Sequence, residues 1–262
     1  MSSEEVVEQV EDGIAVLTLN AVARRNALSL EMRESLRESL RNATASRDIR
    51  ALVLTGAHGT FSAGGDIRKM LMPGELPDPM LARQRLDVLH DIVRLLVAGP
   101  KPVVAAVEGH AFGAGFSLAQ ACDHVVAAEG ASFSAAFGRI GLVADCGLLW
   151  TLPQRTGVGC ARDLLLTGRT VEAAEAHRLG IADTLAPKGQ ALAVALRQAR
   201  QYLSIAPLAI AATKSALARH PASLDDALSI EADLQASLRV SQDHADACEA
   251  FLARRPAVFR GR

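Results

Sequence analysis

Short apolar runs alternate with longer segments of helical period over the first 130 residues, and this pattern most constrains the fold. The apolar runs read as strands and are GIAVLTLN (13–20), IRALVLTG (49–56), PKPVVAAVEG (100–109) and DHVVAAEG (123–130). Amphipathic helices are predicted over 29–46, with Ser29 as the N-cap, over 81–99, and from Ala114 onward. Strands that alternate with helices form parallel sheets, so the predicted fold class is α/β.

The chain changes character near residue 190, beyond which it is alanine-rich with helical period throughout. We therefore expect an α/β core over 1–190 and a helical C-terminal region over 191–262. That region has too few residues to form a large hydrophobic core of its own, so it should pack on the α/β core or on a neighbouring subunit. The proline-rich segment 72–80 is predicted to be a surface loop.

Charge and composition exclude several classes of function. A formal net charge of −1 gives no electrostatic case for nucleic acid or an anionic membrane surface as a partner. No apolar run approaches the ~20 residues that cross a bilayer. The start, MSSEEVVEQV, lacks the regions of a signal peptide, and the four scattered cysteines indicate reduced thiols, so a cytoplasmic location is expected. The seven histidines show no metal-binding spacing, so no metal site is predicted.

Two glycine-rich loops follow predicted strands, LTGAHGTFSAGGDI (54–67) and VEGHAFGAGFSLA (107–119). Glycine permits a positive φ, which lets backbone N–H groups point outward together, and one amide from each loop could form an oxyanion hole. Two tight strand-to-helix connections are the simpler interpretation, and the glycines alone favour it. Neither loop contains a P-loop or a GxGxxG motif, which disfavours phosphoryl or hydride transfer with a nucleotide.

A single carboxylate, Asp145, stands in the apolar stretch FGRIGLVADCG (137–147). It could be a turn or helix-cap residue, a buried structural acid, or a catalytic group. The residues alone leave these alternatives open.

Several motifs in one order resemble the crotonase (enoyl-CoA hydratase/isomerase) superfamily. They are RRNALSLEM (24–32), FSAGGDI (61–67), KPVVAAVEGHAFGAG (101–115), CDHVVAA (122–128), GLVADCG (141–147) and LTGRTVEAAEAHRLGIADTL (166–185). The resemblance implies a core of repeated ββα turns with a helical C-terminal trimerisation region, in a homotrimer or hexamer. It also implies an acyl-CoA thioester substrate, with coenzyme A as part of that substrate and no separate cofactor.

The resemblance implies roles for particular residues. The backbone amides of Gly65 and Ala114 would form the oxyanion hole; members usually carry glycine at the second position, and alanine keeps the N–H. The residues expected to contact coenzyme A are Arg24, Ala63, Asp66 and Ile67. A solvated surface position is an equal alternative for Arg24.

The chain departs from the hydratase pattern at Ser117 and Phe137, where hydratases carry glutamates. Hydration needs one group to activate water and another to deliver a proton, so a two-glutamate mechanism is not expected. Asp145 remains, and its surroundings are most similar to the branch of 1,2-epoxyphenylacetyl-CoA isomerases and Δ3,Δ2-enoyl-CoA isomerases. There the aspartate moves a proton between carbons of the acyl chain, and an apolar pocket strengthens it as a base. A one-base enoyl-CoA isomerase is therefore the leading hypothesis.

Two alternatives stay open. Aroyl-CoA dehalogenases of this superfamily pair an aspartate at the position of Asp145 with a histidine in the helix that holds His90. A dehalogenase or acyl-CoA hydrolase would then use Asp145 as nucleophile and His90 as base, although such enzymes carry tryptophan in place of Phe137. The other alternative is a CoA-thioester-binding protein without catalysis. Phe251 would line the coenzyme A site of a neighbouring subunit, by the same resemblance.

Overall fold

The computed structural model describes residues 5–70 and 79–262, and its centre is a six-stranded sheet in the order β1-β2-β3-β4-β6-β9. The strands are β1 (Val6–Glu11), β2 (Ile14–Leu19), β3 (Ala51–Gly56), β4 (Val103–Val107), β6 (His124–Ala128) and β9 (Thr184–Ala186). Only β1 runs antiparallel to its neighbour; the other pairs in this sheet are parallel. A second sheet joins β5 (His110–Phe112), β7 (Ser132–Ser134) and β8 (Thr170–Glu172). The predicted parallel α/β core is confirmed.

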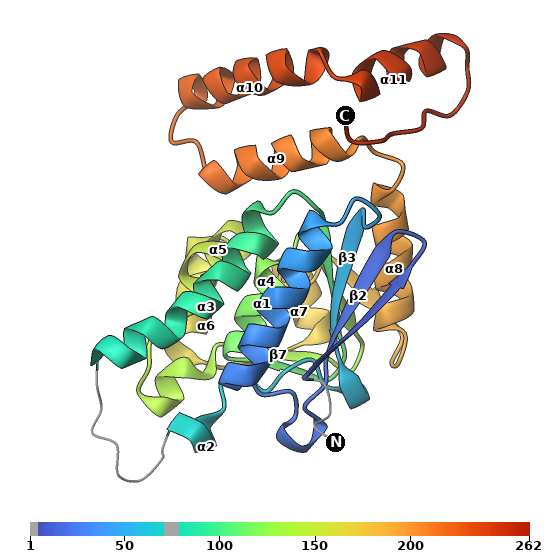
Figure 1. Cartoon of the computed structure of the whole chain (residues 1–262). Helices are drawn as coiled ribbons and strands as arrows, with labels where there is room; N and C mark the ends of the chain where they lie inside the picture. The colour runs from blue at the N-terminus through green and yellow to red at the C-terminus, as the bar shows by residue number, and fades with distance from the viewer. Residues whose placement is uncertain (1–4, 71–78) are drawn as a thin grey trace.

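Strands β2, β3, β4 and β6 are buried on both faces because helices cover each side of the sheet (Figure 1), whereas the edge strand β1 is largely exposed. Leu17 and Leu54 belong to the apolar cluster formed with α1 (Leu30–Ala45) and α3 (Pro79–Ala98). Their neighbours Val16 and Val53 point the other way, into the cluster formed with α8 (Ala191–Tyr202). This double burial explains why the strands read as nearly continuous apolar runs.

Strand β1 was not predicted, although the sequence carries a signal for it. Asp12 and Gly13 connect β1 to β2 with φ of 51° and 78°, the geometry of a two-residue hairpin turn. An Asp-Gly pair between two strands is a strong short-range hairpin signal. The segment before this pair contains several glutamates, which are uncommon in strands, and for this reason it was not predicted as a strand.

The remaining helices place the loops of the candidate site. They are α2 (Ile67–Met70), α4 (Ala114–Ala121), α5 (Leu148–Thr156), α6 (Val158–Thr167), α7 (Ala173–Leu179), α9 (Pro207–Arg219), α10 (Leu224–Arg239) and α11 (Gln242–Leu252), with short 3-10 turns η1 (Val22–Arg24), η2 (Ala57–Gly59) and η3 (Ala136–Ile140). Ser29 caps α1 as predicted, since its Oγ accepts a hydrogen bond from the N–H of Met32 at 3.3 Å. The predicted helix start at Ala114 is also confirmed.

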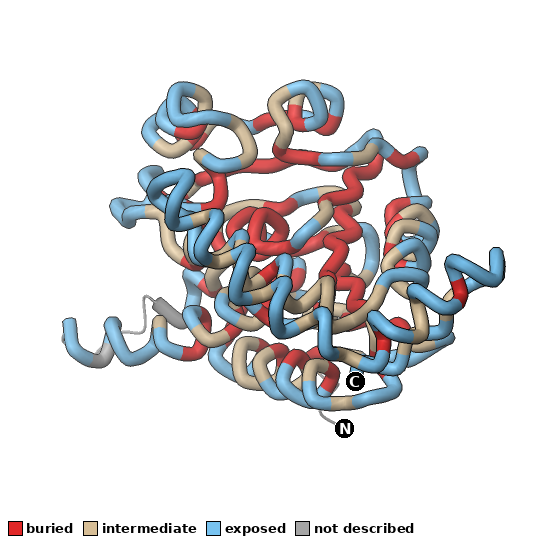
Figure 2. Tube along the Cα trace, turned by 90° about the horizontal axis from the view of Figure 1, so that it is seen from above, coloured by how far each residue is buried: buried red, intermediate tan, exposed pale blue. Residues whose placement is uncertain are grey.

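The C-terminal region is helical, as predicted, and its last three helices form an arm over one end of the core (Figure 1). Viewed from the side of this arm, buried residues gather in the middle of the molecule beneath largely exposed helices (Figure 2). Helix α8 instead packs on the sheet. The division into 1–190 and 191–262 stays a prediction.

Of the predicted loop over 72–80, residues 72–78 lie outside the described part of the chain. Residues 79 and 80 already belong to α3, so the prediction is wrong there: the helical period of the following segment extends back to Pro79, which suits a first helical turn. Within 5–70 and 79–262, no helix is both long and apolar enough to cross a membrane.

Candidate active site

Three segments that are far apart in the sequence are joined by backbone hydrogen bonds. The N–H of Leu28 donates to the carbonyl of Gly64 at 2.7 Å. On the other side of the same loop, Ser62 donates to His110 at 2.9 Å and accepts from Phe112 at 3.0 Å. The two predicted glycine loops are therefore held side by side.

Glycine is required where these loops meet. Gly64 has a φ of +93°, and a Cβ built there would lie 2.7 Å from the carbonyl oxygen of Phe112 and 3.4 Å from the nitrogen of Ala114. Ala114 is the first residue of α4, whose N-cap Gly113 supplies no side-chain cap. In the described part of the chain, the amides of Gly65 and Ala114 donate to no other residue. Two free N–H groups, one from each loop, are thus available to an external acceptor.

Asp145 lies in the loop between η3 and α5, and it is largely withdrawn from water. Its Oδ1 is buried and has no hydrogen-bond partner among the described residues. Burial raises the pKa of Asp145, while the hydrogen bond from the Cys146 thiol and the charges of Arg33 and His90 act in the opposite direction. A desolvated carboxyl with one free oxygen is suited to proton transfer or nucleophilic attack.

Arg33 connects the acid to the glycine loops, and sequence reasoning missed it. Its Nε donates to the carbonyl of Leu28 at 3.0 Å, on the segment that bonds to Gly64. Burial lowers the pKa of Arg33, and the electrostatic effects of Cys146 and Asp145 oppose that shift. No signal in the sequence links α1 to residue 145, because the contact is made only by the tertiary fold.

Cys146 was also missed. It is fully buried and has a φ of 50°, which is uncommon for a residue with a Cβ. Burial raises its pKa well above the ordinary value, and the carboxylate of Asp145 adds to the shift. The sulfur therefore keeps its hydrogen and can donate it to Asp145.

The structure brings His90 into this neighbourhood. His90 is exposed on α3, and its charge is one of those that lower the pKa of Asp145. The Asp145 loop packs on the next turn of α3, since a Cβ at Gly147 would lie 3.0 Å from Cγ1 of Val93. The loop that holds Asp145 therefore packs on the helix that holds His90, and a role of His90 in the site stays a prediction.

Ser117 and Phe137 do not supply a second acid or a nucleophile. The Oγ of Ser117 is buried and donates to the carbonyl of Gly113 at 3.3 Å, within its own helix. Phe137 is buried, and its ring reaches within 4.0 Å of a Cβ built at Gly113. The ring thus forms an apolar wall beside the Ala114 amide.

The residues predicted to contact coenzyme A lie on adjoining loops. Arg24 donates to both carboxylate oxygens of Glu5, at 2.8 and 2.6 Å, and its Nε is 3.9 Å from Asp66. The hydrogen bond to Glu5 is the main reason why the pKa of Arg24 is raised. Ala63 and Ile67 are exposed, whereas Asp66 is buried. Arg24 is neither a free surface residue nor a fully available anion ligand, because acids of its own chain already hold it.

Asn26 is the positioning residue inside the RRNAL motif. It is fully buried with a φ of 56°, and its amide donates to the carbonyls of Ala57 and Thr60 at 3.1 and 2.7 Å. Its own carbonyl accepts from Ser62 Oγ at 2.8 Å. These hydrogen bonds of the RRNAL motif therefore hold the first glycine-rich loop in place.

Among the described residues, no three His, Cys, Asp or Glu side chains are grouped to hold a metal ion.

Comparison with known proteins gives consistent matches over the whole chain. The enoyl-CoA hydratase/isomerase family matches residues 9–262. The sequence is 36% identical to the 1,2-epoxyphenylacetyl-CoA isomerase of Escherichia coli, over 99% of each chain, and 32% identical to the 2,3-dehydroadipyl-CoA hydratase of the same organism, over 98% of this chain and 99% of that protein. The crystal structure of an enoyl-CoA hydratase from Polaromonas sp. JS666 superposes with a TM-score of 0.91 at 34% identity, covering 97% of this chain and 99% of that one. The predicted crotonase-type fold is thereby confirmed.

Proposed function

Because the chain belongs to the enoyl-CoA hydratase/isomerase family, we propose that it is a one-base enoyl-CoA isomerase acting on an acyl-CoA thioester. The observation that carries the proposal is the buried, unpartnered Oδ1 of Asp145, in a site where Ser117 and Phe137 replace the glutamates of hydratases. The resemblance to an isomerase over the full length supports it.

The amides of Gly65 and Ala114 hold the thioester oxygen. Removing a proton from the carbon next to a thioester places negative charge on this oxygen, and two preorganised donors stabilise that charge. Loss of one such donor costs about 3–4 kcal/mol in comparable enzymes. The arrangement needs no cofactor beyond the coenzyme A of the substrate itself.

Asp145 moves the proton. As the carboxylate it takes a proton from C2 of a 3-enoyl-CoA, and the electron pair passes into a dienolate whose oxygen lies in the amide pair. The carboxylic acid so formed returns the proton to C4, which leaves the double bond between C2 and C3. Atoms and charge balance with a single base, and burial strengthens that base by raising its pKa.

The remaining assignments belong to the same proposal. Ala63, Asp66 and Ile67 contact the coenzyme A moiety. Arg24 lies beside these residues and stays paired with Glu5.

The chain assembles as a homotrimer or a dimer of trimers through its C-terminal helices. In support, Phe251 at the end of α11 is 83% exposed, which suits a side chain that completes a neighbouring subunit's site.

The test compares Asp145→Asn with Asp225→Asn, a control at an exposed position on α10. Both variants should bind coenzyme A as the wild type does. Only Asp145→Asn should lose conversion of 3-enoyl-CoA to 2-enoyl-CoA, by about 10²-fold or more. Unchanged turnover in Asp145→Asn would remove this residue from the mechanism.

A second candidate is an acyl-CoA hydrolase or aroyl-CoA dehalogenase, and the electrostatic effect of His90 on Asp145 favours it. In a dehalogenase, Asp145 attacks the ring carbon that carries the halogen, which forms an aryl ester and releases halide. In a hydrolase, Asp145 attacks the thioester carbon, which forms a mixed anhydride and releases the coenzyme A thiolate. In both cases His90 deprotonates the water that cleaves the intermediate. Oxygen from H₂¹⁸O would then enter the Asp145 carboxylate over multiple turnovers, and His90→Gln would accumulate the covalent intermediate. An isomerase shows neither effect.

A further inference from the structure

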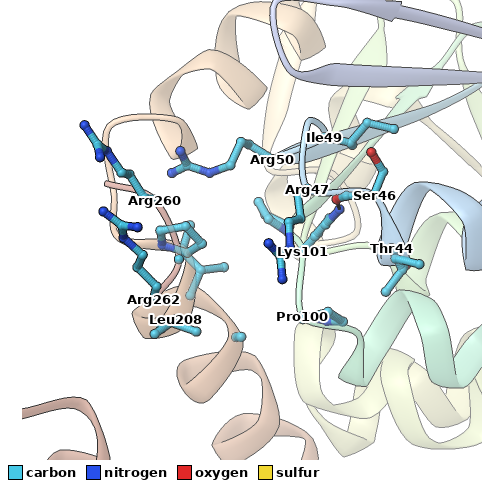
Figure 3. A pocket seen from close by; sticks show the side chains of 16 residues that line it. Thr44, Ser46, Arg47, Ile49, Arg50, Pro100, Lys101, Leu208, Arg260 and Arg262 are labelled. Atoms are coloured by element: carbon cyan, nitrogen blue, oxygen red, sulfur yellow. Dashed lines mark hydrogen bonds between the residues drawn. The ribbon is translucent and has the colours of Figure 1, made fainter. Parts of the chain in front are cut away.

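A cavity of about 330 Å³ lies at the C-terminal end of α1, whereas the candidate active site lies near the start of this helix. Its walls are the end of α1, the segments before β3 and β4, the start of α9, and the C-terminal tail (Figure 3). The lining residues that carry charge are Arg47, Arg50, Lys101, Arg260 and Arg262, and no acidic side chain is among the residues that line the cavity.

Two of these cations are half-buried, and their hydrogen-bond partners among the described residues are backbone carbonyls. Arg50 donates to Ile205 at 2.9 Å and, more weakly, to Phe259 at 3.4 Å. Lys101 donates to the carbonyls of Ala43 and Ser46 at the end of α1. Burial lowers the pKa of Lys101, and the charge of Arg50 lowers it further, so the two cations repel each other. The charge of Asp243 acts on Arg50 in the opposite direction to burial.

The other three cations are free. The guanidinium groups of Arg47, Arg260 and Arg262 form no hydrogen bond or ion pair with the described residues. Asp243, the acid nearest to the tail, is already occupied, since its carboxylate accepts the backbone N–H groups of Arg260 and Gly261 at 2.7 and 2.8 Å. In Figure 3, Arg260 and Arg262 stand on one side of the cavity and face Arg47, Arg50 and Lys101 on the other.

Helix α9 adds positive potential at the same place. Its first residues, Pro207 and Leu208, line the cavity, and Ala206 provides no side-chain cap for its free N–H groups. The N-terminus of a 13-residue helix carries a partial positive charge. The helix and the five cations together favour an anion.

We propose that this cavity binds an organic phosphate monoester, a site separate from the acyl-CoA site. Guanidinium groups match phosphate oxygens in paired hydrogen bonds. The volume is large for a lone ion and suits a small organic molecule. Ile49, Pro100 and Ile210 supply apolar walls for its body.

The probe is phenyl phosphate, titrated into the full chain by calorimetry beside phenol and benzoate. Wild-type protein should bind phenyl phosphate saturably, benzoate more weakly and phenol not at all. The double variant Arg47→Ala/Arg260→Ala should weaken this binding by about tenfold or more, since each lost charge-assisted hydrogen bond is worth about that factor. These two side chains hold no backbone group, so the melting temperature should stay unchanged.

Arg200→Ala/Arg239→Ala is the matched control, because both side chains are exposed outside the cavity, and it should bind phenyl phosphate as the wild type does. The proposal is overturned if the wild type shows no saturable binding or if both double variants bind equally. Benzoate that binds as tightly as phenyl phosphate would also overturn it, by assigning the cavity to carboxylates. If the wild type does not bind phenyl phosphate and Arg47→Ala/Arg260→Ala changes the oligomeric mass, the proposal is also overturned. The cavity would then be an interface between copies of the chain.

Discussion

The thiol of Cys146 hydrogen-bonds to the carboxyl group of Asp145, its neighbour in the chain, and lowers the pKa that burial raises. Cys146 is fully buried and takes a φ of 50°, which is uncommon for a residue with a Cβ. The proton affinity of Asp145 is therefore set by a balance between burial and a few specific neighbours.

Cys146→Ala removes the thiol donor and so raises the pKa of Asp145. The proposed base works as the carboxylate, so the acidic limb of the pH–rate profile should move to higher pH. Cys146→Ser keeps a donor and should leave the limb in place or move it to lower pH. Cys122→Ala, at another buried cysteine, is the control. A limb that stays fixed in Cys146→Ala would show that this contact does not tune the base.

Arg33→Met removes the positive charge that lies between Asp145 and Leu28. The pKa of Asp145 should rise, so the acidic limb should again move to higher pH. The carbonyl of Leu28 also loses its donor, which should cost about 1–2 kcal/mol of stability. Arg33→Lys restores the charge without the paired geometry and should recover the position of the limb. If Arg33→Met lowers stability but leaves the pH profile unchanged, Arg33 is structural only.

Asp145→Asn should stabilise the protein at neutral pH. Because folding raises the pKa of Asp145, the native state binds this proton more tightly than the unfolded state does. The stability gained from that proton is present below the unfolded pKa and is lost as pH rises through the folded pKa. The advantage of the variant should therefore grow with pH and level off at about 1 kcal/mol. Urea unfolding of both proteins at several pH values measures it, and an advantage that shrinks as pH rises would contradict the assignment.

The sequence predicted the parallel core and the paired glycine loops because both leave local signals. Continuous apolar runs mark strands such as β3, and a serine before a helical period marks the start of α1. Arg33 and Cys146 leave no such signal. Their roles depend on which loop reaches α1 and on one unusual backbone angle, and both are fixed only when the chain packs. His90 was identified through the resemblance alone, and its part in the site stays a prediction.

Gly64→Ala should disrupt the amide pair. The new Cβ would lie 2.7 Å from the backbone oxygen of Phe112, at a φ of +93°. We expect a loss of about 2 kcal/mol of stability and about 10²-fold in turnover, since one oxyanion donor is displaced. Gly130→Ala is the matched control, because a Cβ there meets no atom within 4 Å. Equal turnover in the two variants would mean that the loops can separate without affecting the reaction.

Lys214 fastens α9 to the core, and its removal should loosen the C-terminal arm. Its side chain is 7% exposed, donates to the carbonyl of Leu96 at 2.8 Å and pairs with Asp123. Lys214→Met should cost about 1–2 kcal/mol, because the carbonyl of Leu96 loses its donor and the partly exposed side chain of Asp123 loses its cation.

The double variant Lys214→Met/Asp123→Asn should recover part of this loss, since no unpaired charge remains. Arg255→Met is the control: its pair with Glu249 is exposed and should contribute less than about 1 kcal/mol. Thermal unfolding measures the free energies, and limited proteolysis should cut the segment before α9 sooner in Lys214→Met than in the wild type. Equal losses in Lys214→Met and Arg255→Met would show that the arm is held by apolar packing alone.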